Sequence, residues 1–314
     1  MAVPDTPFST LFGFSLRGQS DIAEGSIVAF GAPLQSSAPR RPGTDAGPSA
    51  IREISCDLLQ PYLASPSRTA VDLSSNRAKR LRDFGASSDL GDLPCEGPVS
   101  TIDIERVAQL TAAIVAAGAF PILLGGDHRV FEGLVRGVRA AAGAPAILSV
   151  SDKITLPPAT DAAPLPLGGL ASATADPSPV LCVGVNSLQS AASWDGLHAV
   201  GGAVISADAL HETRPQAVET INSFIAKNEP CVCGVDLEVV DSGHAAGTPS
   251  VNVGGATPEQ LIDLLSEIDI PAPLAGIAIT NVAPKLDARG LTELAAAKAL
   301  LALLDNQLFT EAAP

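Results

Sequence analysis

Titratable side chains follow three short apolar runs of the chain, and their types limit the chemistry they could do. His128 follows one run, Ser151–Thr155 the next, and Asp236–Asp241 a third. The carboxylates of the third group are of the kind that hold a hard cation weakly. Lys153, in the second group, would act as a general base only if burial lowered its pKa. The sequence therefore raises two possibilities, cation binding and acid–base catalysis.

Lys153 is also the residue that argues against a bound cation. Its ammonium has three donors and no lone pair, and its charge repels a metal ion. Asp236 and Glu238 are two positions apart, so on a strand both carboxylates would face one side. They would repel each other unless a positive group lay between them. We expect the ammonium of Lys153 to lie within salt-bridge distance of one of them, as a buried pair that replaces a cation.

The histidines have plain structural interpretations as well. His128 could be a buried histidine that hydrogen-bonds to Asp236 across strand ends. Asp127 could cap the helix that begins near Val130. Three more histidines stand alone in expected loops and are interpreted as solvated: His198, His211 and His244.

Alternating apolar runs and amphipathic segments predict the elements that carry these groups. The expected strands are Ser26–Ala32, Pro121–Leu124, Ala146–Val150, Val180–Val185, Ala203–Ser206, Cys231–Leu237 and Ala275–Val282. The expected helices are Ile102–Ala117, Val130–Ala142, Arg214–Ala226, a helix from Pro258 to about Ile268, and Leu291–Leu304. Thr213 and Thr257 are the expected N-caps of the third and fourth helices.

This alternation predicts an α/β fold, a mainly parallel sheet with helices on both faces. In such sheets, ligands bind beyond the carboxyl ends of the strands, which is where the titratable groups are expected. Stretches rich in Pro and Gly are expected to be loops: Pro33–Pro48, Pro157–Gly169 and Gly243–Gly255.

Composition excludes several classes of protein. Of the 314 residues, 46% are hydrophobic and the net charge is −15. The acidic balance argues against nucleic-acid partners and against anionic membrane surfaces. No apolar stretch is long enough to predict a transmembrane helix, and no secretory signal is evident, so a cytoplasmic location is expected. The five cysteines, an odd number, are expected to be mostly buried free thiols, with Cys231 and Cys233 on one side of a strand.

An ordered set of motifs resembles the ureohydrolase family, which includes arginases and agmatinases. The matching stretches, in chain order, are Gly31–Pro33, Arg41–Arg52, Asp89–Leu93, Leu124–His128, Val235–Asp241, Ala246–Thr248, and the trio Asp287, Gly290 and Thr292. The resemblance runs from about residue 27 to 304. It implies a three-layer α/β/α, arginase-like fold. We expect one domain over residues 1–314, with the first 20 or so residues as an arm or extension.

Members of that family activate a water between two metal ions, usually manganese or nickel, and the resemblance implies six ligand positions. One is the His of Gly-Gly-Asp-His, here His128. Three lie in an Asp-Ala-His-x-Asp stretch, where this chain has Ser151, Lys153 and Thr155. Two lie in an Asp-x-Asp stretch, where it has Asp236 and Glu238. These are vestigial positions, so no metal and no catalytic residue is expected in this chain.

Two more positions of the family pattern differ. Asn281 occupies the place of a substrate-side Glu that lies three residues before a Pro, here Pro284. Asn186 stands where many members have Arg. The loop Pro157–Gly169 also lacks the His that the family uses there. Asn186 and Asn281 are therefore vestigial substrate-side residues.

A fold kept whole after its ligands are lost suggests a role in assembly. The leading hypothesis is a non-catalytic subunit of a heteromeric ureohydrolase. Its partner would be a catalytic paralogue that binds nickel or manganese and hydrolyses a guanidine or biguanide. A hetero-oligomer based on trimers or hexamers is expected. The alternatives are a stand-alone hydrolase with metal-independent chemistry, and a small-molecule sensor that uses the old pocket.

Overall fold

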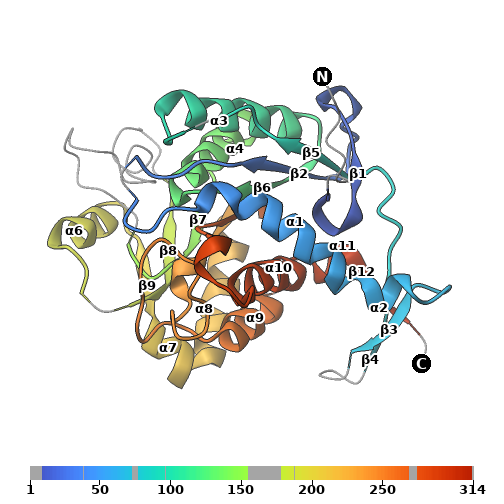
Figure 1. Ribbon diagram of the computed structural model, residues 1–314. Coiled ribbons are helices and arrows are strands. Elements are labelled where there is room, and N and C mark those ends of the chain that lie inside the picture. The colour runs from blue at the N-terminus through green and yellow to red at the C-terminus, as the bar shows by residue number, and fades with distance from the viewer. Residues whose placement is uncertain are drawn as a thin grey trace.

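A computed structural model describes residues 9–37, 39–72, 77–95, 97–154, 178–186, 188–268 and 274–312. A twisted nine-stranded sheet forms the middle layer, in the order β1-β5-β2-β6-β11-β10-β7-β8-β9 (Figure 1). Every strand pair in it is parallel. Helices cover both faces, so the three-layer α/β/α fold predicted from the sequence is confirmed.

Seven of the nine strands of the large sheet match the expected strands closely, whereas the two at Ser15–Leu16 and Ser88–Asp92 were not predicted. The nine strands are β1 (Ser15–Leu16), β2 (Ile27–Ala32), β5 (Ser88–Asp92), β6 (Phe120–Gly125), β7 (Ala146–Val150), β8 (Val180–Val185), β9 (Ala203–Ser206), β10 (Cys231–Asp236) and β11 (Leu274–Thr280). Four of them, β2, β7, β8 and β10, are buried along their whole length, as parallel strands with two covered faces are. Cys231 and Cys233 share one core, as expected, and burial raises the pKa of both thiols.

The two faces have separate apolar cores. One core takes side chains from α1 (Gly47–Leu58), α7 (Ala207–Glu212), α8 (Arg214–Lys227), α9 (Pro258–Glu267) and α10 (Leu291–Leu303). The other takes them from α3 (Thr101–Ala116), α4 (Phe131–Ala142) and α6 (Ala191–Ala199). The shorter helices α2 (Gln60–Leu63) and α11 (Asp305–Leu308) lie near the C-terminus. None of the helices in the described residues is long and apolar enough to cross a membrane.

Local capping signals fix several helix ends. Thr257 accepts from the Gln260 amide, and the Gln260 side chain accepts from the Thr257 amide, so the predicted capping box is confirmed. Thr213 is the N-cap residue of α8, as predicted, but its hydroxyl donates to the Ala209 carbonyl and makes no side-chain capping bond to α8. The preceding α7, which the sequence reading lacked, presents that carbonyl at hydrogen-bonding distance.

A buried ion cluster joins α1 to β5. Arg52, fully buried, donates from Nε and Nη2 to both oxygens of Asp89, at 2.8 and 3.0 Å, and from Nη1 to Asp92 at 2.5 Å. Asp89 also accepts from the Leu11 amide, so the chain before β1 is held against the same cluster. The described part of the expected N-terminal extension is therefore packed on the domain, with Phe12 buried beside it.

The closing motif of the chain serves the fold in a similar way. Asp287 accepts from the amide and the hydroxyl of Thr292, in the first turn of α10. The Thr292 hydroxyl in turn accepts from the Gly247 amide. A Cβ at Gly247 would crowd both Asp287 and Thr292. The motif residues Gly247, Asp287 and Thr292 thus tie the loop after β10 to α10.

A small antiparallel sheet was not expected from the sequence. It has the order β12-β4-β3, from β3 (Thr69–Asp72), β4 (Arg77–Leu81) and β12 (Phe309–Ala312), and it projects beside the C-terminus (Figure 1). The strand β4 carries three basic residues among five, which hides its alternation. Its pairing with β12 also joins segments far apart in the sequence.

Candidate functional site

The predicted site lies on one rim of the large sheet, at the carboxyl ends of four neighbouring strands. His128 follows β6 in a short 3-10 helix (His128–Val130), and Ser151 and Lys153 follow β7. Asp236 ends β10, and Asn281 follows β11. The order β6-β11-β10-β7 places these strand ends side by side. The expectation that these groups share one rim is confirmed.

Close backbone packing shapes the turn that presents His128. A Cβ at Gly126 would collide with the backbone of Leu34, so only glycine fits there. Asp127 accepts from the Arg129 amide at 2.9 Å, which confirms its expected capping role. The carbonyl oxygen of Leu34 also accepts a hydrogen bond from the backbone amide of Asp127. The Gly-Gly-Asp-His stretch is thus fixed by its neighbours before any ligand is considered.

Asp236 lies at the centre of the site, and protein donors reach both of its oxygens. Oδ1 accepts from the Glu238 amide and from Nδ2 of Asn281, each at 2.9 Å. Oδ2 accepts from the Ser151 hydroxyl at 3.3 Å. Asn281 and Ser151 are two of the substituted positions. Both therefore now donate hydrogen bonds to the one aspartate that is retained.

Asn281 reaches Asp236 because of an unusual backbone conformation. Its φ is +62°, in the left-handed region, which asparagine tolerates better than most residues. Its amide oxygen accepts from the His128 amide at 3.1 Å, and its own backbone N–H donates to Gly126. The side chain predicted to be substrate-side is thus a buried link between three strand ends.

Glu238 does not lie on the strand, which corrects the prediction that it and Asp236 share a face through strand alternation. Residues Leu237–Val239 form a 3-10 turn, and Asp236 caps that turn. The turn, rather than a two-residue period, brings the two carboxylates close. Burial raises the pKa of Glu238, and the neighbouring charge of Asp236 adds to this shift.

Lys153 is where the sequence placed it, against the carboxylates. Its Nζ lies 2.5 Å from Glu238 Oε2 and 3.5 Å from Asp152 Oδ2, and it also donates to the Ser250 hydroxyl at 3.3 Å. The predicted ion pair with Glu238 is confirmed, but its expected full burial is wrong. The Lys153 side chain is 47% exposed, because it reaches the carboxylates from the solvent side. Burial opposes its charge, yet Glu238 and Asp152 outweigh this and raise its pKa.

Asp152 is a member of the site that the sequence reading did not single out. Oxygens of Asp152, Asp236 and Glu238 lie within 4.8 Å of one another. Burial, with the charge of Asp236, raises the pKa of Asp152 to about 7. Its position directly between Ser151 and Lys153, at the end of a buried strand, was the available signal. The family pattern has alanine at that position, so the resemblance implies no role for Asp152.

His128 is buried and held by a neighbour other than the one expected. Its Nδ1 pairs with the Thr280 hydroxyl at 2.7 Å and lies 4.0 Å from Asp236, too far for a hydrogen bond. The predicted His128–Asp236 hydrogen bond is therefore wrong. Burial lowers the pKa of His128 to about 4, so the imidazole is neutral at neutral pH.

The remaining expected positions lie elsewhere. Thr155 and the loop Pro157–Gly169 fall outside the described residues. Asn186 follows β8 and donates through Nδ2 to Asn252 and to the Val253 carbonyl, which joins two rim loops. The expectation that His198 and His211 lie in loops is wrong: His198 meets the Trp194 ring edge-on within α6, and His211, in α7, pairs with the side chain of Gln260.

These residues do not fit the two-metal centre of the resembling family. Asp236 has its oxygens engaged, and Ser151 and Asn281 act on it as donors. Lys153 brings a positive charge to Glu238, where a ligand would need a free lone pair. Three clustered carboxylates could still face one hard cation, but the Lys153 ammonium already pairs with two of them, Glu238 and Asp152.

Comparison with known proteins agrees with the motifs. The Arginase family model matches residues 25–305. An agmatinase from Bacillus anthracis is 25% identical over 292 residues, which cover 90% of this chain and 92% of the agmatinase. The formimidoylglutamase structure from Bacillus subtilis superposes with a TM-score of 0.79 at 20% identity, covering 98% of this chain and 96% of that one. Proclavaminate amidinohydrolase from Streptomyces clavuligerus gives 0.76 at 21%, covering 96% and 98%. The chain belongs to the arginase family.

Proposed function

We propose that this chain is a non-catalytic subunit of a heteromeric ureohydrolase, and that a metal-dependent paralogue supplies the catalytic centre. The observation that carries the proposal is the ammonium of Lys153, 2.5 Å from Glu238 and 3.5 Å from Asp152. It occupies the position where the family has a metal-ligating histidine. A tethered cation there neutralises the carboxylate charge that a metal ion would otherwise neutralise.

The hydrogen bonds around Asp236 support the same proposal. Ser151 and Asn281 replace family positions with donors, and both donate to Asp236. Buried carboxylates need such partners when no cation supplies them. The substitutions therefore form a consistent set that keeps the rim folded, which is what selection for assembly would retain.

The electrostatics argue against stand-alone chemistry by these residues. A general base must be unprotonated and able to reach substrate. The raised pKa of Lys153 keeps its amine charged at neutral pH. The neutral His128 is buried, with Nδ1 engaged by Thr280. Neither group meets both conditions.

The partner's chemistry is proposed by analogy. Relatives of this chain include enzymes named agmatinase, proclavaminate amidinohydrolase and guanidino acid hydrolase. The sequence pattern also resembles that of the ligand-poor subunit of two-subunit nickel hydrolases that split metformin into guanylurea and dimethylamine. The partner is therefore proposed to bind nickel or manganese and to hydrolyse a guanidine or biguanide, with metformin as the first substrate to test. A trimer- or hexamer-based assembly is proposed on the same grounds.

Co-expression tests the proposal. The chain is produced with an affinity tag, alone and together with an untagged paralogue that has a complete Asp-Ala-His-x-Asp stretch. The expected result is a stable complex that hydrolyses the guanidine, while this chain alone has no activity with manganese or nickel added. A homo-oligomer of this chain that turns over a guanidine, or a chain that never binds the paralogue, would contradict the proposal.

A further inference from the structure

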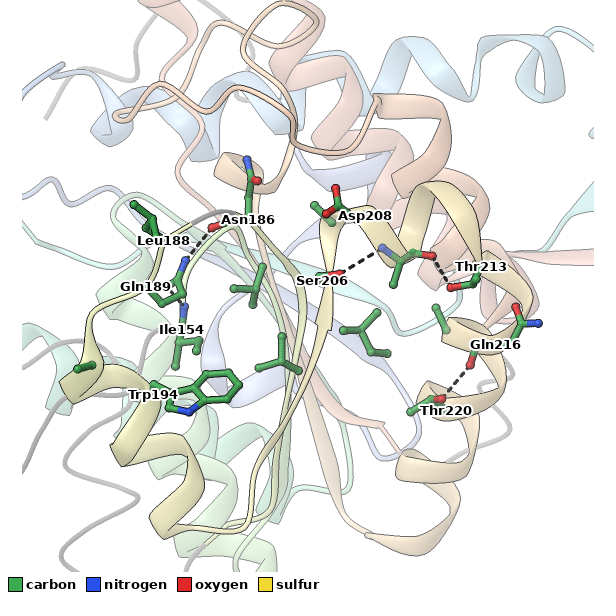
Figure 2. Close-up of a pocket in the computed structure, with 17 residues that line it drawn as sticks. Ile154, Asn186, Leu188, Gln189, Trp194, Ser206, Asp208, Thr213, Gln216 and Thr220 are labelled. Atoms are coloured by element: carbon green, nitrogen blue, oxygen red, sulfur yellow. Dashed lines mark hydrogen bonds between the residues drawn. The ribbon is translucent and has the colours of Figure 1, made fainter.

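A groove of about 910 Å³ straddles β9, the last strand of the large sheet (Figure 2). Ile154, Leu188 and Trp194 line it on one side of the strand, and helices α7 and α8 line it on the other. The groove lies beyond the carboxylate cluster, and none of the three clustered acids lines it. The carboxylate cluster thus lies outside the groove, although Asn186, one of the vestigial substrate-side positions, is among the lining residues.

The floor of the groove is a free sheet edge. β9 pairs in parallel with β8, and no other described segment pairs with it. Alternate N–H and C=O groups of such a strand point outward without a partner, ready to pair with a further strand. Its side chains alternate as well: Val204 packs with the core under α6, and Ile205 with the core under α8.

Apolar side chains stand exposed on the rim of this edge. Leu188 is 98% exposed and Trp194, the single tryptophan of the chain, is 47% exposed. An added strand would place alternate side chains against Trp194 and Val204 on one face and against Ala209 and Ala217 on the other. This arrangement, a bare backbone edge between two apolar walls, is that of strand-addition sites.

Charge selects among possible occupants. Of the described residues that line the groove, Asp208 is the one with a charged side chain. Exposed acids also stand on the helices around it, at Asp195, Glu212 and Glu219. Arg214 is engaged with Asp263 and Glu267, at 2.5 and 3.0 Å. A second copy of this chain would bring acid against acid, whereas a basic segment would be attracted.

We propose that this groove binds an extended, positively charged segment of a different polypeptide chain, which pairs with β9 as an additional strand. Backbone hydrogen bonds supply the pairing, the apolar walls receive alternate side chains, and Asp208 attracts the basic ones. The inference stands whether or not that chain is the catalytic paralogue, because it depends only on the edge and its surroundings.

The test uses synthetic peptides and the fluorescence of Trp194. A peptide of alternating valine and lysine should bind saturably and shift the Trp194 emission to shorter wavelength. The same peptide N-methylated at alternate residues, which removes the donors on one edge, should fail to bind. Asp208→Lys should weaken binding about fivefold or more, as expected for reversing one partly exposed charge. The matched control Glu259→Lys, an exposed acid on α9 outside the groove, should leave affinity unchanged.

Three results would overturn the proposal. Equal binding of the N-methylated peptide would show that no strand pairs with β9. Equal binding of a valine–glutamate peptide, or equal effects of the two charge reversals, would remove the role of Asp208. Dimerisation of the chain that Trp194→Ala abolishes would assign the groove to a second copy.

Discussion

Three carboxylates meet at the rim of the sheet, and each is compensated in its own way. Asp236 accepts hydrogen bonds from Ser151, Glu238 and Asn281. Glu238 is paired with the ammonium of Lys153. Asp152 is compensated least: the ammonium of Lys153 lies 3.5 Å from its Oδ2, and its pKa is raised to about 7. These differences decide which substitution should have which effect.

Removing the tethered cation should open the cluster to a metal. In Lys153→Met the aliphatic stem remains, but Glu238 and Asp152 lose their positive neighbour. Because Lys153 is half-exposed, we expect a loss of about 1–2 kcal/mol in the free energy of unfolding, less than for a fully buried pair. Manganese should restore part of this stability in the variant and have little effect on the wild type. Urea titrations with and without MnCl₂ measure both. Equal responses to manganese in the two proteins would refute the tethered-cation account.

Asp152 should make stability depend on pH. Its pKa is raised in the folded state, so the folded chain holds a proton that the unfolded chain has released between about pH 4 and pH 7. Its stabilising effect is complete below that window and is lost as pH rises through it. Asp152→Asn stays neutral, so at pH 8 the variant should be about 1–3 kcal/mol more stable than the wild type, and near equal to it at pH 4. Urea unfolding at the two pH values checks this; a variant less stable at pH 8 would be inconsistent with the raised pKa.

Among the helices and strands, local sequence signals were sufficient to predict an element where its partners are close in the sequence. The N-cap of α9 and the buried strands were predicted from neighbouring residues. The 3-10 turn at Glu238 was missed because an apolar run continues through Leu237 and Val239 and resembles strand. The β12–β4 pairing was missed because no local pattern joins positions so far apart.

In the candidate site as well, some positions could be predicted from the sequence and others depended on the tertiary structure. Ser151, Lys153, Asp236 and Glu238 were placed together because strand ends of a parallel sheet share a rim. The Thr280 partner of His128 and the left-handed Asn281 could not be predicted, since each depends on how β11 lies between β6 and β10.

The ion cluster that joins α1 to β5 should be essential to the fold. Arg52→Met would leave Asp89 buried without its bidentate partner, at a cost of about 3–5 kcal/mol in unfolding free energy. Arg52→Lys retains the charge but not the forked geometry, so its free energy of unfolding should lie between those of Arg52→Met and the wild type. Thermal and urea unfolding rank the three proteins. A fully stable Arg52→Met would mean that the cluster contributes little.

At the scale of the whole molecule, the arginase-family fold is complete, while Ser151 and Lys153 stand at positions where the family resemblance implies metal ligands. Both cores, the parallel sheet and the closing motif are retained. Of the substituted positions that the structure describes, Ser151 and Asn281 donate to Asp236, and Lys153 pairs with Glu238. A fold preserved around an altered rim is consistent with a chain that is used for binding other chains.

The proposed loss of metal ligands predicts that the purified chain binds little metal. The chain purified alone, incubated with manganese or nickel and then desalted, should contain well under one ion per chain. The Bacillus anthracis agmatinase, treated in the same way, is the comparison protein. Elemental analysis that found two ions per chain would contradict the proposed vestigial site.

The central claim is tested most directly inside the assembled complex with the catalytic paralogue. Asp236→Asn in this chain keeps the shape of the side chain, and turnover should stay within about threefold of wild type, since no reacting group is removed. The matching substitution in the partner should abolish turnover. Size-exclusion chromatography confirms that both variants assemble. A loss above about a hundredfold from Asp236→Asn in an intact complex, equivalent to ~2.7 kcal/mol of barrier, would show that this chain takes part in the chemistry.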